Sequence, residues 1–347
     1  MIDSSIDKTN MHKSITDFSV HIKESFDFFK ENSSLTKNYN DINNIMILGM
    51  GGSAITGLLM KELLKNDLDI PIEVNQGYNI PKWVNNKTLI LACSYSGNTE
   101  ETLISCEECF KKTSNVIGIS KGGKLFDLLK NKALNEYVKM PDGLQPRAAL
   151  GFSFSLMLIL LNKLEIIGDS FIKDLKNSIP NLAEKTKAYS SKDSSNVAYS
   201  TANKIYNKNP LIYAEEGIFN IIGYRFKCQL VENSKVLAFN NAVPEMNHNE
   251  IEAYTNTVNI KDNFVVIWIN DSSYHDRNAK RIKIVTNIWR NKVKEQLLLE
   301  VEENSDNKIL KYLSYIHLVD WISYHAAILN KIDPSIIPNI NELKKSL

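Results

Sequence analysis

The chain has 347 residues, which is enough for two domains of ordinary size with a substantial core. Its 41 Lys and Arg residues nearly balance its 40 Asp and Glu residues, so no overall field favours a nucleic acid or a membrane surface, and an anionic ligand needs a local site. No apolar stretch reaches the length of a membrane span, and the first residues lack the basic and apolar regions of a secretory signal, so we expect a cytoplasmic protein.

Apolar residues recur at an imperfect helical spacing over residues 12–31, which predicts a helix packed against the body of the protein. We expect an N-terminal helical segment of residues 1–39 and a first domain of residues 40–176. The composition turns polar from residue 177, and residues 190–195 are the expected linker. A second domain is expected over residues 195–347.

A glycine-rich turn, Gly49-Met50-Gly51-Gly52-Ser53-Ala54, separates a predicted strand at 45–48 from a helix predicted at about 55–64. A dinucleotide site is one interpretation, but the third glycine of G-x-G-x-x-G is missing and Glu73 is a weak match for the acidic residue. No Gly-Lys-Ser/Thr follows, so the turn is not a P-loop. The alternative is that Gly52 and Ser53 help to hold a phosphate group.

A second turn, Ser94-Tyr95-Ser96-Gly97-Asn98-Thr99, follows an apolar run at 88–93 that is typical of a buried parallel strand. A helix with an acidic first turn is predicted directly after it. The free N–H groups of that helix start, together with the hydroxyls of Ser94, Ser96 and Thr99, predict an anion site. An ordinary helix N-cap would explain one such hydroxyl, whereas three at this spacing favour phosphate.

Further strands predicted at 70–74 and 116–119 alternate with helices, which indicates a doubly wound α/β sheet. Ligands of such sheets lie beyond the carboxyl ends of the strands, where both turns occur, so we expect one shared site. Arg147 follows in a Pro/Gly-rich loop at the start of an apolar helix, where the helix dipole disfavours a cation. An anionic ligand would explain it; the alternative is a solvated surface arginine.

The second half repeats the plan without a second hydroxyl turn, with strands predicted at 211–214, 265–269 and 296–301 and helices at 218–230, 276–289 and 306–329. It offers acid–base groups instead: Glu232 at a helix end and His248 in a polar loop. Taken alone, Glu232 reads more readily as a solvated carboxylate. Cys106 and Cys109 form a lone Cys-x-x-Cys, which we interpret as buried thiols in preference to a metal site.

The motif Ser-x-Ser-Gly-x-Thr after a buried strand resembles the phosphate-binding turn of the sugar isomerase (SIS) domain family, which also has a Gly-Gly-Ser-Ala turn and a Pro-Arg pair at corresponding places. The spacing of Glu232 and His248 and the C-terminal pattern Asp333-Pro334, Ile340 and Leu343-Lys344 are similar to the phosphoglucose/phosphomannose isomerase branch. The resemblance covers about residues 40–347. It implies an α/β protein of two doubly wound parallel-sheet SIS-type domains, with an N-terminal helix and a C-terminal helical segment.

The resemblance implies an aldose–ketose isomerase that interconverts glucose 6-phosphate, and mannose 6-phosphate, with fructose 6-phosphate through a cis-enediolate. It implies Glu232 as the base and acid, Arg147 as the cation beside the enediolate, and His248 and Lys344 in ring opening; the Leu-Lys pattern favours Lys344 over the adjacent Lys345. It implies no metal or other cofactor, and a homodimer in which His248 acts in the partner's site. Glycolysis and gluconeogenesis are the expected setting.

Ile337 stands before Pro338 where archaeal-type bifunctional enzymes carry a Thr that is credited with making room for the mannose epimer. Glucose 6-phosphate is therefore the firmer expectation. One alternative function is a non-catalytic sugar-phosphate sensor, which would need a helix-turn-helix domain for which we expect no room in the short N-terminal segment. The other is an aminosugar-phosphate isomerase, which assays of fructose 6-phosphate with and without an amine donor would tell apart.

Overall fold

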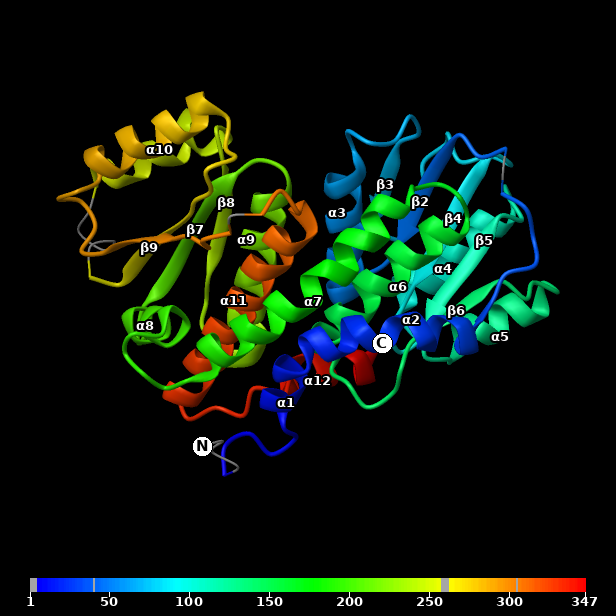
Figure 1. Cartoon of the computed structure of the whole chain (residues 1–347), viewed down its shortest axis with the longest axis horizontal. Helices are drawn as coiled ribbons and strands as arrows, with labels where there is room; N and C mark the ends of the chain where they lie inside the picture. The colour runs from blue at the N-terminus through cyan, green and yellow to red at the C-terminus, as the bar shows by residue number, and fades with distance from the viewer. Residues whose placement is uncertain (1–4, 40, 257–261, 304) are drawn as a thin grey trace. The chain divides into compact units, whose positions relative to one another are not determined.

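A computed structural model describes residues 5–39, 41–256, 262–303 and 305–347 (Figure 1). The chain divides into two compact units: an N-terminal unit of Asp17–Ile179, and a C-terminal unit of Met1–Thr16 with Pro180–Leu347. The units divide at Pro180, inside helix α7 (Asp169–Ser190), while residues 191–195 form the loop that leads to α8. The polar composition from residue 177 thus belongs largely to a helix. Its inner face carries buried Ser178 and Thr186, which hid the helical periodicity.

The N-terminal unit is built on a six-stranded sheet of order β1-β6-β5-β4-β2-β3, in which the pair β1–β6 is antiparallel and the other pairs are parallel. Its strands and helices are α2 (Phe18–Asn32), β1 (Ser33–Ser34), β2 (Asn44–Leu48), α3 (Gly51–Leu64), β3 (Ile72–Asn75), β4 (Thr88–Cys93), α4 (Glu100–Phe110), β5 (Val116–Ser120), α5 (Lys124–Asn131), β6 (Tyr137–Lys139), the 3-10 turn η1 (Pro146–Ala148), α6 (Leu150–Lys163) and the first part of α7. The expected N-terminal helix forms as α2 and a separate short helix, α1 (Met11–Thr16), in the other unit.

Helices cover both faces of this sheet, as the doubly wound prediction requires. Side chains of β2 and β4 alternate between the faces, so Met46, Leu48 and Ile90 pack with α4 and α5, while Ile47 contacts α3. Cys106 and Cys109 are buried in the α4 side of this core, and burial raises the pKa of both thiols, that of Cys109 to about 12. The two cysteines therefore act as apolar core residues.

The C-terminal unit is built on a four-stranded parallel sheet of order β10-β9-β7-β8. Its strands and helices are α1, the second part of α7, α8 (Val197–Lys204), β7 (Asn209–Glu215), α9 (Ile218–Gln229), the π-helical turn η2 (Leu230–Ser234), β8 (Phe239–Val243), the 3-10 turns η3 (Glu245–His248) and η4 (Glu250–Thr255), β9 (Phe264–Ile269), α10 (Asp276–Ile288), β10 (Gln296–Leu299), α11 (Lys308–Leu329) and α12 (Pro338–Ser346). The predicted strands and helices of the second half are confirmed, and α12 is the expected C-terminal helical segment.

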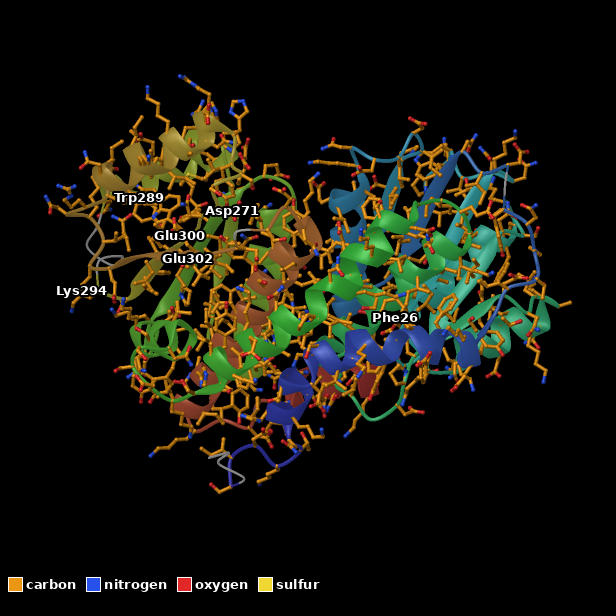
Figure 2. All side chains as sticks on the ribbon, in the orientation of Figure 1. Phe26, Asp271, Trp289, Lys294, Glu300 and Glu302 are labelled. Atoms are coloured by element: carbon orange, nitrogen blue, oxygen red, sulfur yellow. The ribbon has the colours of Figure 1, made fainter. Side chains whose placement is uncertain are left out.

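Aromatic side chains make a cation–π contact in the N-terminal unit and a stacked pair in the C-terminal unit. In the N-terminal unit, the Lys176 ammonium of α7 lies 4.9 Å from the ring centroid of Phe26 on α2. In the C-terminal unit, the fully buried Trp289 stacks on Tyr254 with ring centroids 3.7 Å apart. Figure 2 labels Phe26 and Trp289. Such paired rings stabilise a core beyond the area that they bury.

Candidate active site

The hydroxyl turn lies between β4 and α4, as predicted, and its own side chains hold its shape. Ser94 is 1% exposed, and its Oγ accepts hydrogen bonds from the N–H groups of Gly97 at 3.1 Å and Thr99 at 3.4 Å. Gly97 has φ +74°, and a Cβ there would lie 1.7 Å from the carbonyl oxygen of Gly122. Only glycine fits that position.

The three hydroxyls of this turn differ in how many of their hydrogen-bonding positions are used within the turn. Ser94 Oγ lies 2.8 Å from Thr99 Oγ1 and already accepts from two N–H groups, so its single proton is best used toward Thr99. That arrangement leaves the Thr99 hydroxyl proton for an external acceptor. Ser96 Oγ accepts from the Asn98 N–H at 3.2 Å and likewise keeps its proton. The hydroxyls of Ser96 and Thr99 therefore have protons available for a ligand, whereas the hydroxyl of Ser94 is used in hydrogen bonds within the turn.

The glycine turn and the Arg147 loop meet beside the hydroxyl turn. Gly52 and Ser53 lie in the first turn of α3, which begins earlier than the sequence predicts, and a Cβ on Gly52 would lie 2.9 Å from the carbonyl oxygen of Pro146. One pocket of the N-terminal unit is lined by residues of all three segments: Gly52, Ser53, Cys93, Tyr95, Pro146 and Ala149. The structure thus brings both turns to one place at the carboxyl ends of the strands. The close approach of the Pro146 backbone explains why position 52 is a glycine, without a dinucleotide.

Arg147 lies in η1, directly before α6, and is only 4% exposed. This burial excludes the solvated surface arginine that the sequence left open. A buried guanidinium at a helix N-terminus is costly unless anions or hydrogen-bond acceptors surround it. Its backbone lies beside the first turn of α3, where a Cβ on Gly52 would be 3.6 Å from the Arg147 Cα, so Arg147 belongs to the surroundings of the candidate site.

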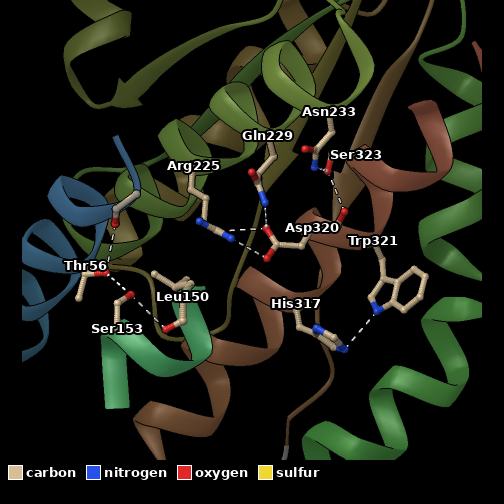
Figure 3. A network of polar contacts seen from close by, with 11 residues as sticks. Thr56, Leu150, Ser153, Arg225, Gln229, Asn233, His317, Asp320, Trp321 and Ser323 are labelled. Carbon is tan, nitrogen blue, oxygen red and sulfur yellow. Dashed lines mark hydrogen bonds and ion pairs between the residues drawn. The ribbon is translucent and has the colours of Figure 1, made fainter. Parts of the chain in front are cut away.

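Glu232 lies in the π-helical turn η2 at the end of α9, and its side chain is half-buried. The two residues that follow Glu232 fix this turn, since Asn233 and Ser234 are fully buried and Asn233 Nδ2 donates to Ser323 Oγ of α11 at 2.9 Å (Figure 3). Lys235 follows with φ +55° and donates from Nζ to the carbonyl oxygens of Glu232 and Ile336, both at 2.6 Å. π-Helical turns of this kind are frequent at functional sites.

A buried ion pair fixes the helix that carries Glu232. Arg225 of α9 donates to the Asp320 carboxylate of α11 through Nε at 3.0 Å and Nη2 at 2.7 Å, and Gln229 Nε2 donates to the same carboxylate at 2.8 Å (Figure 3). Arg225 and Gln229 are four residues apart, so both face α11. These hydrogen bonds hold α9 against α11 and so fix the end of α9 at which Glu232 lies.

His248 and Glu232 lie at opposite edges of the C-terminal sheet. Helix α9 starts after the carboxyl end of β7 and returns to the amino edge, where η2 carries Glu232, whereas His248 follows the carboxyl end of β8. β8 has five residues, so at about 3.3 Å per residue the edges are roughly 16 Å apart. His248 is exposed in η3, which confirms that it is no core histidine. Within one chain the two residues therefore lie toward opposite ends of the parallel strands.

The remaining candidates lie in the C-terminal segment. Ile337 is half-buried and immediately precedes α12, whose lysines Lys344 and Lys345 are both exposed. Adjacent helical residues point about 100° apart, so only one of the two lysines can face a given site. Lys235 holds the backbone of Ile336 next to this segment.

Four residues that fix the candidate site residues within each unit were not predicted from the sequence. Tyr95, Arg225, Asp320 and Lys235 carry polar groups bonded to segments distant in sequence. A charged Asp320 inside the apolar run of α11, with Arg225 and Gln229 at helical spacing, was a readable signal of a buried pair. In the described parts of the chain, no helix is long and apolar enough to cross a membrane, and no three His, Cys, Asp or Glu side chains gather as metal ligands would.

Comparisons with known proteins place the chain in a family. Residues 194–347 match the bacterial phospho-glucose isomerase C-terminal SIS domain. The chain is 34% identical over 339 residues to the bifunctional phosphoglucose/phosphomannose isomerase of Caldicellulosiruptor bescii, covering 97% of this chain and 98% of that protein. It is 34% identical to the bifunctional phosphoglucose/phosphomannose isomerase of Thermoplasma volcanium, covering 87% of this chain and 91% of that protein.

Solved structures share the fold. The C-terminal domain of glucosamine-fructose-6-phosphate aminotransferase from Francisella tularensis superposes with a TM-score of 0.70 at 15% identity, covering 97% of this chain and all of that domain. The fold resemblance is thus wider than the sequence resemblance. The extent of the sequence identity shows that the chain belongs to the family of bifunctional phosphoglucose/phosphomannose isomerases.

Proposed function

We propose that the protein is an aldose–ketose isomerase that interconverts glucose 6-phosphate and mannose 6-phosphate with fructose 6-phosphate. The observation that carries this proposal is the meeting of the hydroxyl turn, the first turn of α3 and the loop that contains the buried Arg147 beside one pocket of the N-terminal unit. Two sets of N–H and O–H donors and a permanent cation suit a phosphate group and a second, developing anion. Its relatives carry the names of these two isomerases.

Ser96 and Thr99, with the N–H groups at the start of α4, bind the phosphate group in this proposal, and Gly52 and Ser53 contribute from α3. Ser94 supports binding by holding the turn. The reaction moves a proton between C2 and C1 of the open-chain sugar. Glu232 takes the C2 proton, which leaves a cis-enediolate, and returns it to C1. Arg147 stabilises the negative charge that develops on the enediolate, because a guanidinium stays protonated.

Cyclic hexose phosphates must open before isomerisation, which requires proton transfers at O1 and O5. We assign this step to His248 and Lys344. The separation of His248 from Glu232 across the sheet supports a homodimer in which His248 enters the partner's site, since a two-fold axis gives each site the same borrowed residue. Cytoplasmic carbohydrate metabolism, in glycolysis and gluconeogenesis, is the proposed setting.

An assay of purified protein tests the proposed reaction. Glucose 6-phosphate and mannose 6-phosphate should each yield fructose 6-phosphate without an amine donor, read through a coupled dehydrogenase that reduces the ketone of fructose 6-phosphate with NADH. A non-catalytic sensor would bind the sugar phosphates without turnover. An aminosugar-phosphate isomerase would turn over only aminated sugars, and either result would contradict the proposal.

Replacing both donors of the hydroxyl turn should weaken substrate binding. A protein with Ser96→Ala and Thr99→Ala loses two hydrogen bonds to a charged phosphate, each worth about 1.5–3 kcal/mol, so affinity should fall about 100-fold or more. Titration with fructose 6-phosphate, followed calorimetrically, measures this loss. Ser105→Ala is the matched control, because that hydroxyl lies on the same helix α4 but donates to the carbonyl oxygen of Glu101. Equal affinities for the double variant and the control would refute the assignment.

Ile337→Thr should raise the activity on mannose 6-phosphate relative to glucose 6-phosphate. Ile337 is half-buried just before α12, so a smaller, polar side chain there would open space and offer a hydroxyl. The ratio of the two kcat/KM values measures the effect, and Ile336→Thr, at the exposed neighbouring position, is the control. An unchanged ratio would remove this position from the list of specificity determinants.

A further inference from the structure

Tyr95 joins the hydroxyl turn to the loop that carries Arg147. Its hydroxyl donates a hydrogen bond to the carbonyl oxygen of Pro141 at 2.7 Å and accepts one from the N–H of Leu144 at 3.1 Å. A phenolic hydroxyl has one proton to donate, and here that proton and one acceptor position are both used on the loop backbone. The side chain is 9% exposed. Burial raises the pKa of Tyr95, so the donating proton stays in place at neutral pH.

Both ends of this connection are fixed. At the turn, the Lys121 N–H donates to the Tyr95 carbonyl oxygen at 3.1 Å, so the backbone of Tyr95 is tied to the segment that follows β5. In the loop, the N–H groups of Ala148 and Ala149 donate to the Gln145 carbonyl oxygen at 2.9 and 3.1 Å. Gln145, the residue after Leu144, thereby closes the 3-10 turn that contains Arg147.

A second link runs in parallel but is weaker. Lys121 Nζ lies 3.0 Å from Asp142 Oδ1, with the Asp142 side chain 77% exposed. Exposed ion pairs contribute little, because water screens them. The buried hydroxyl of Tyr95 is therefore the main connection between the turn and the loop.

We propose that Tyr95 is a positioning residue that sets the distance between the bound phosphate group and the Arg147 guanidinium. The proposal rests on the proposed function, in which the turn holds the phosphate and Arg147 stabilises the enediolate. A sugar phosphate bound in the turn then presents its C1–C2 end to a cation that Tyr95 holds at the matching place. Loss of the hydrogen bonds from Tyr95 should weaken the stabilisation of the transition state and leave the affinity for the substrate unchanged.

Tyr95→Phe removes only the hydroxyl and keeps the ring. We expect kcat for glucose 6-phosphate to fall roughly 10- to 100-fold, since small misplacements of a charge-stabilising group have effects of this size. Affinity for 5-phospho-D-arabinonate, whose carboxylate copies the charge of the enediolate, should fall in parallel. Affinity for sorbitol 6-phosphate, an uncharged-head analogue of the open-chain substrate, should stay within about twofold, because phosphate binding is intact.

Tyr39→Phe is the matched control. Tyr39 is 6% exposed in the same unit, and its hydroxyl donates to Glu136 Oε2 at 3.0 Å, at the amino end of β6 and away from the site. It loses a comparable buried hydrogen bond, so any general effect of destabilisation appears in both variants. Circular dichroism and thermal melts compare their folding. Only Tyr95→Phe should change the ratio of the two analogue affinities.

Arg147→Lys separates failure of this proposal from failure of the proposed function. Should Arg147→Lys retain full kcat, the role of Arg147 itself is wrong. Should it lose activity while Tyr95→Phe behaves like Tyr39→Phe, only the coupling through Tyr95 is wrong. Equal weakening of both analogues by Tyr95→Phe would reduce Tyr95 to a support of the turn and overturn the proposal. If Tyr95 acts through Arg147, Tyr95→Phe should lower kcat less in the Arg147→Lys protein than in the unaltered protein.

Discussion

Glu232→Gln is expected to lose nearly all isomerase activity while still binding sugar phosphates. The amide keeps the shape of the side chain but cannot accept the C2 proton, and general-base catalysis contributes roughly 10²–10⁴-fold. The fall should appear in kcat, with the affinity for sorbitol 6-phosphate unchanged. Hydrogen bonds from Asn233 and Lys235 hold the backbone of η2 in place, so the loss of activity should come from the missing carboxylate and not from a shift of the backbone.

Glu216→Gln is the matched control for this variant, because Glu216 is an exposed carboxylate at the other end of the same helix α9. It should retain activity. Exchange of the C2 proton with solvent must vanish together with turnover in Glu232→Gln. Proton exchange and turnover close to those of the unaltered protein would show that another residue is the base.

Mixing two inactive variants is expected to restore activity if His248 acts in the partner's site. Glu232→Gln and His248→Ala subunits are dissociated, mixed in equal amounts and allowed to reassociate. In a mixed dimer one site then carries both lesions and the other carries neither. Random pairing makes about half of the dimers mixed, so roughly a quarter of all sites should regain activity under two-fold symmetry.

Subunit exchange must be demonstrated separately, for example by energy transfer between labelled subunits. Each variant alone, carried through the same dissociation, gives the background rate. If both residues acted within one chain, every site would keep one lesion. A mixture that exchanges subunits and stays inactive would contradict the shared site.

The sequence predicted the fold well where single elements have strong patterns. The all-apolar β4 and the hydroxyl turn after it were located correctly, because a buried parallel strand and a helix start leave clear local signals. The parallel sheets followed from the alternation of such strands with helices. Helix α7 was missed, since Ser178 and Thr186 occupy its inner face and conceal the apolar period.

The sequence indicated which residues lie in the candidate site better than it indicated the hydrogen bonds that position them. It named Ser94, Ser96 and Thr99 together as phosphate-binding hydroxyls, whereas only the hydrogen bonds show that Ser94 Oγ also holds the turn, a distinction that depends on which lone pairs are occupied. It could not find the link from Tyr95 to Pro141, because contacts between a side chain and distant backbone leave no periodic trace. Tertiary hydrogen bonds, unlike strands, are not written into local composition.

The most direct test of the account is the reaction of glucose 6-phosphate with the unaltered protein in deuterated water, followed by nuclear magnetic resonance. A cis-enediolate shared by the three sugars predicts fructose 6-phosphate with deuterium at C1, and glucose and mannose 6-phosphates with deuterium at C2, as repeated turnovers approach equilibrium. Because Glu232 can return the same proton to C1, the decisive result is the one after many turnovers: sugar phosphates still free of deuterium after prolonged equilibration would contradict proton transfer through an enediolate. Binding of glucose 6-phosphate with neither conversion nor exchange would contradict the isomerase itself.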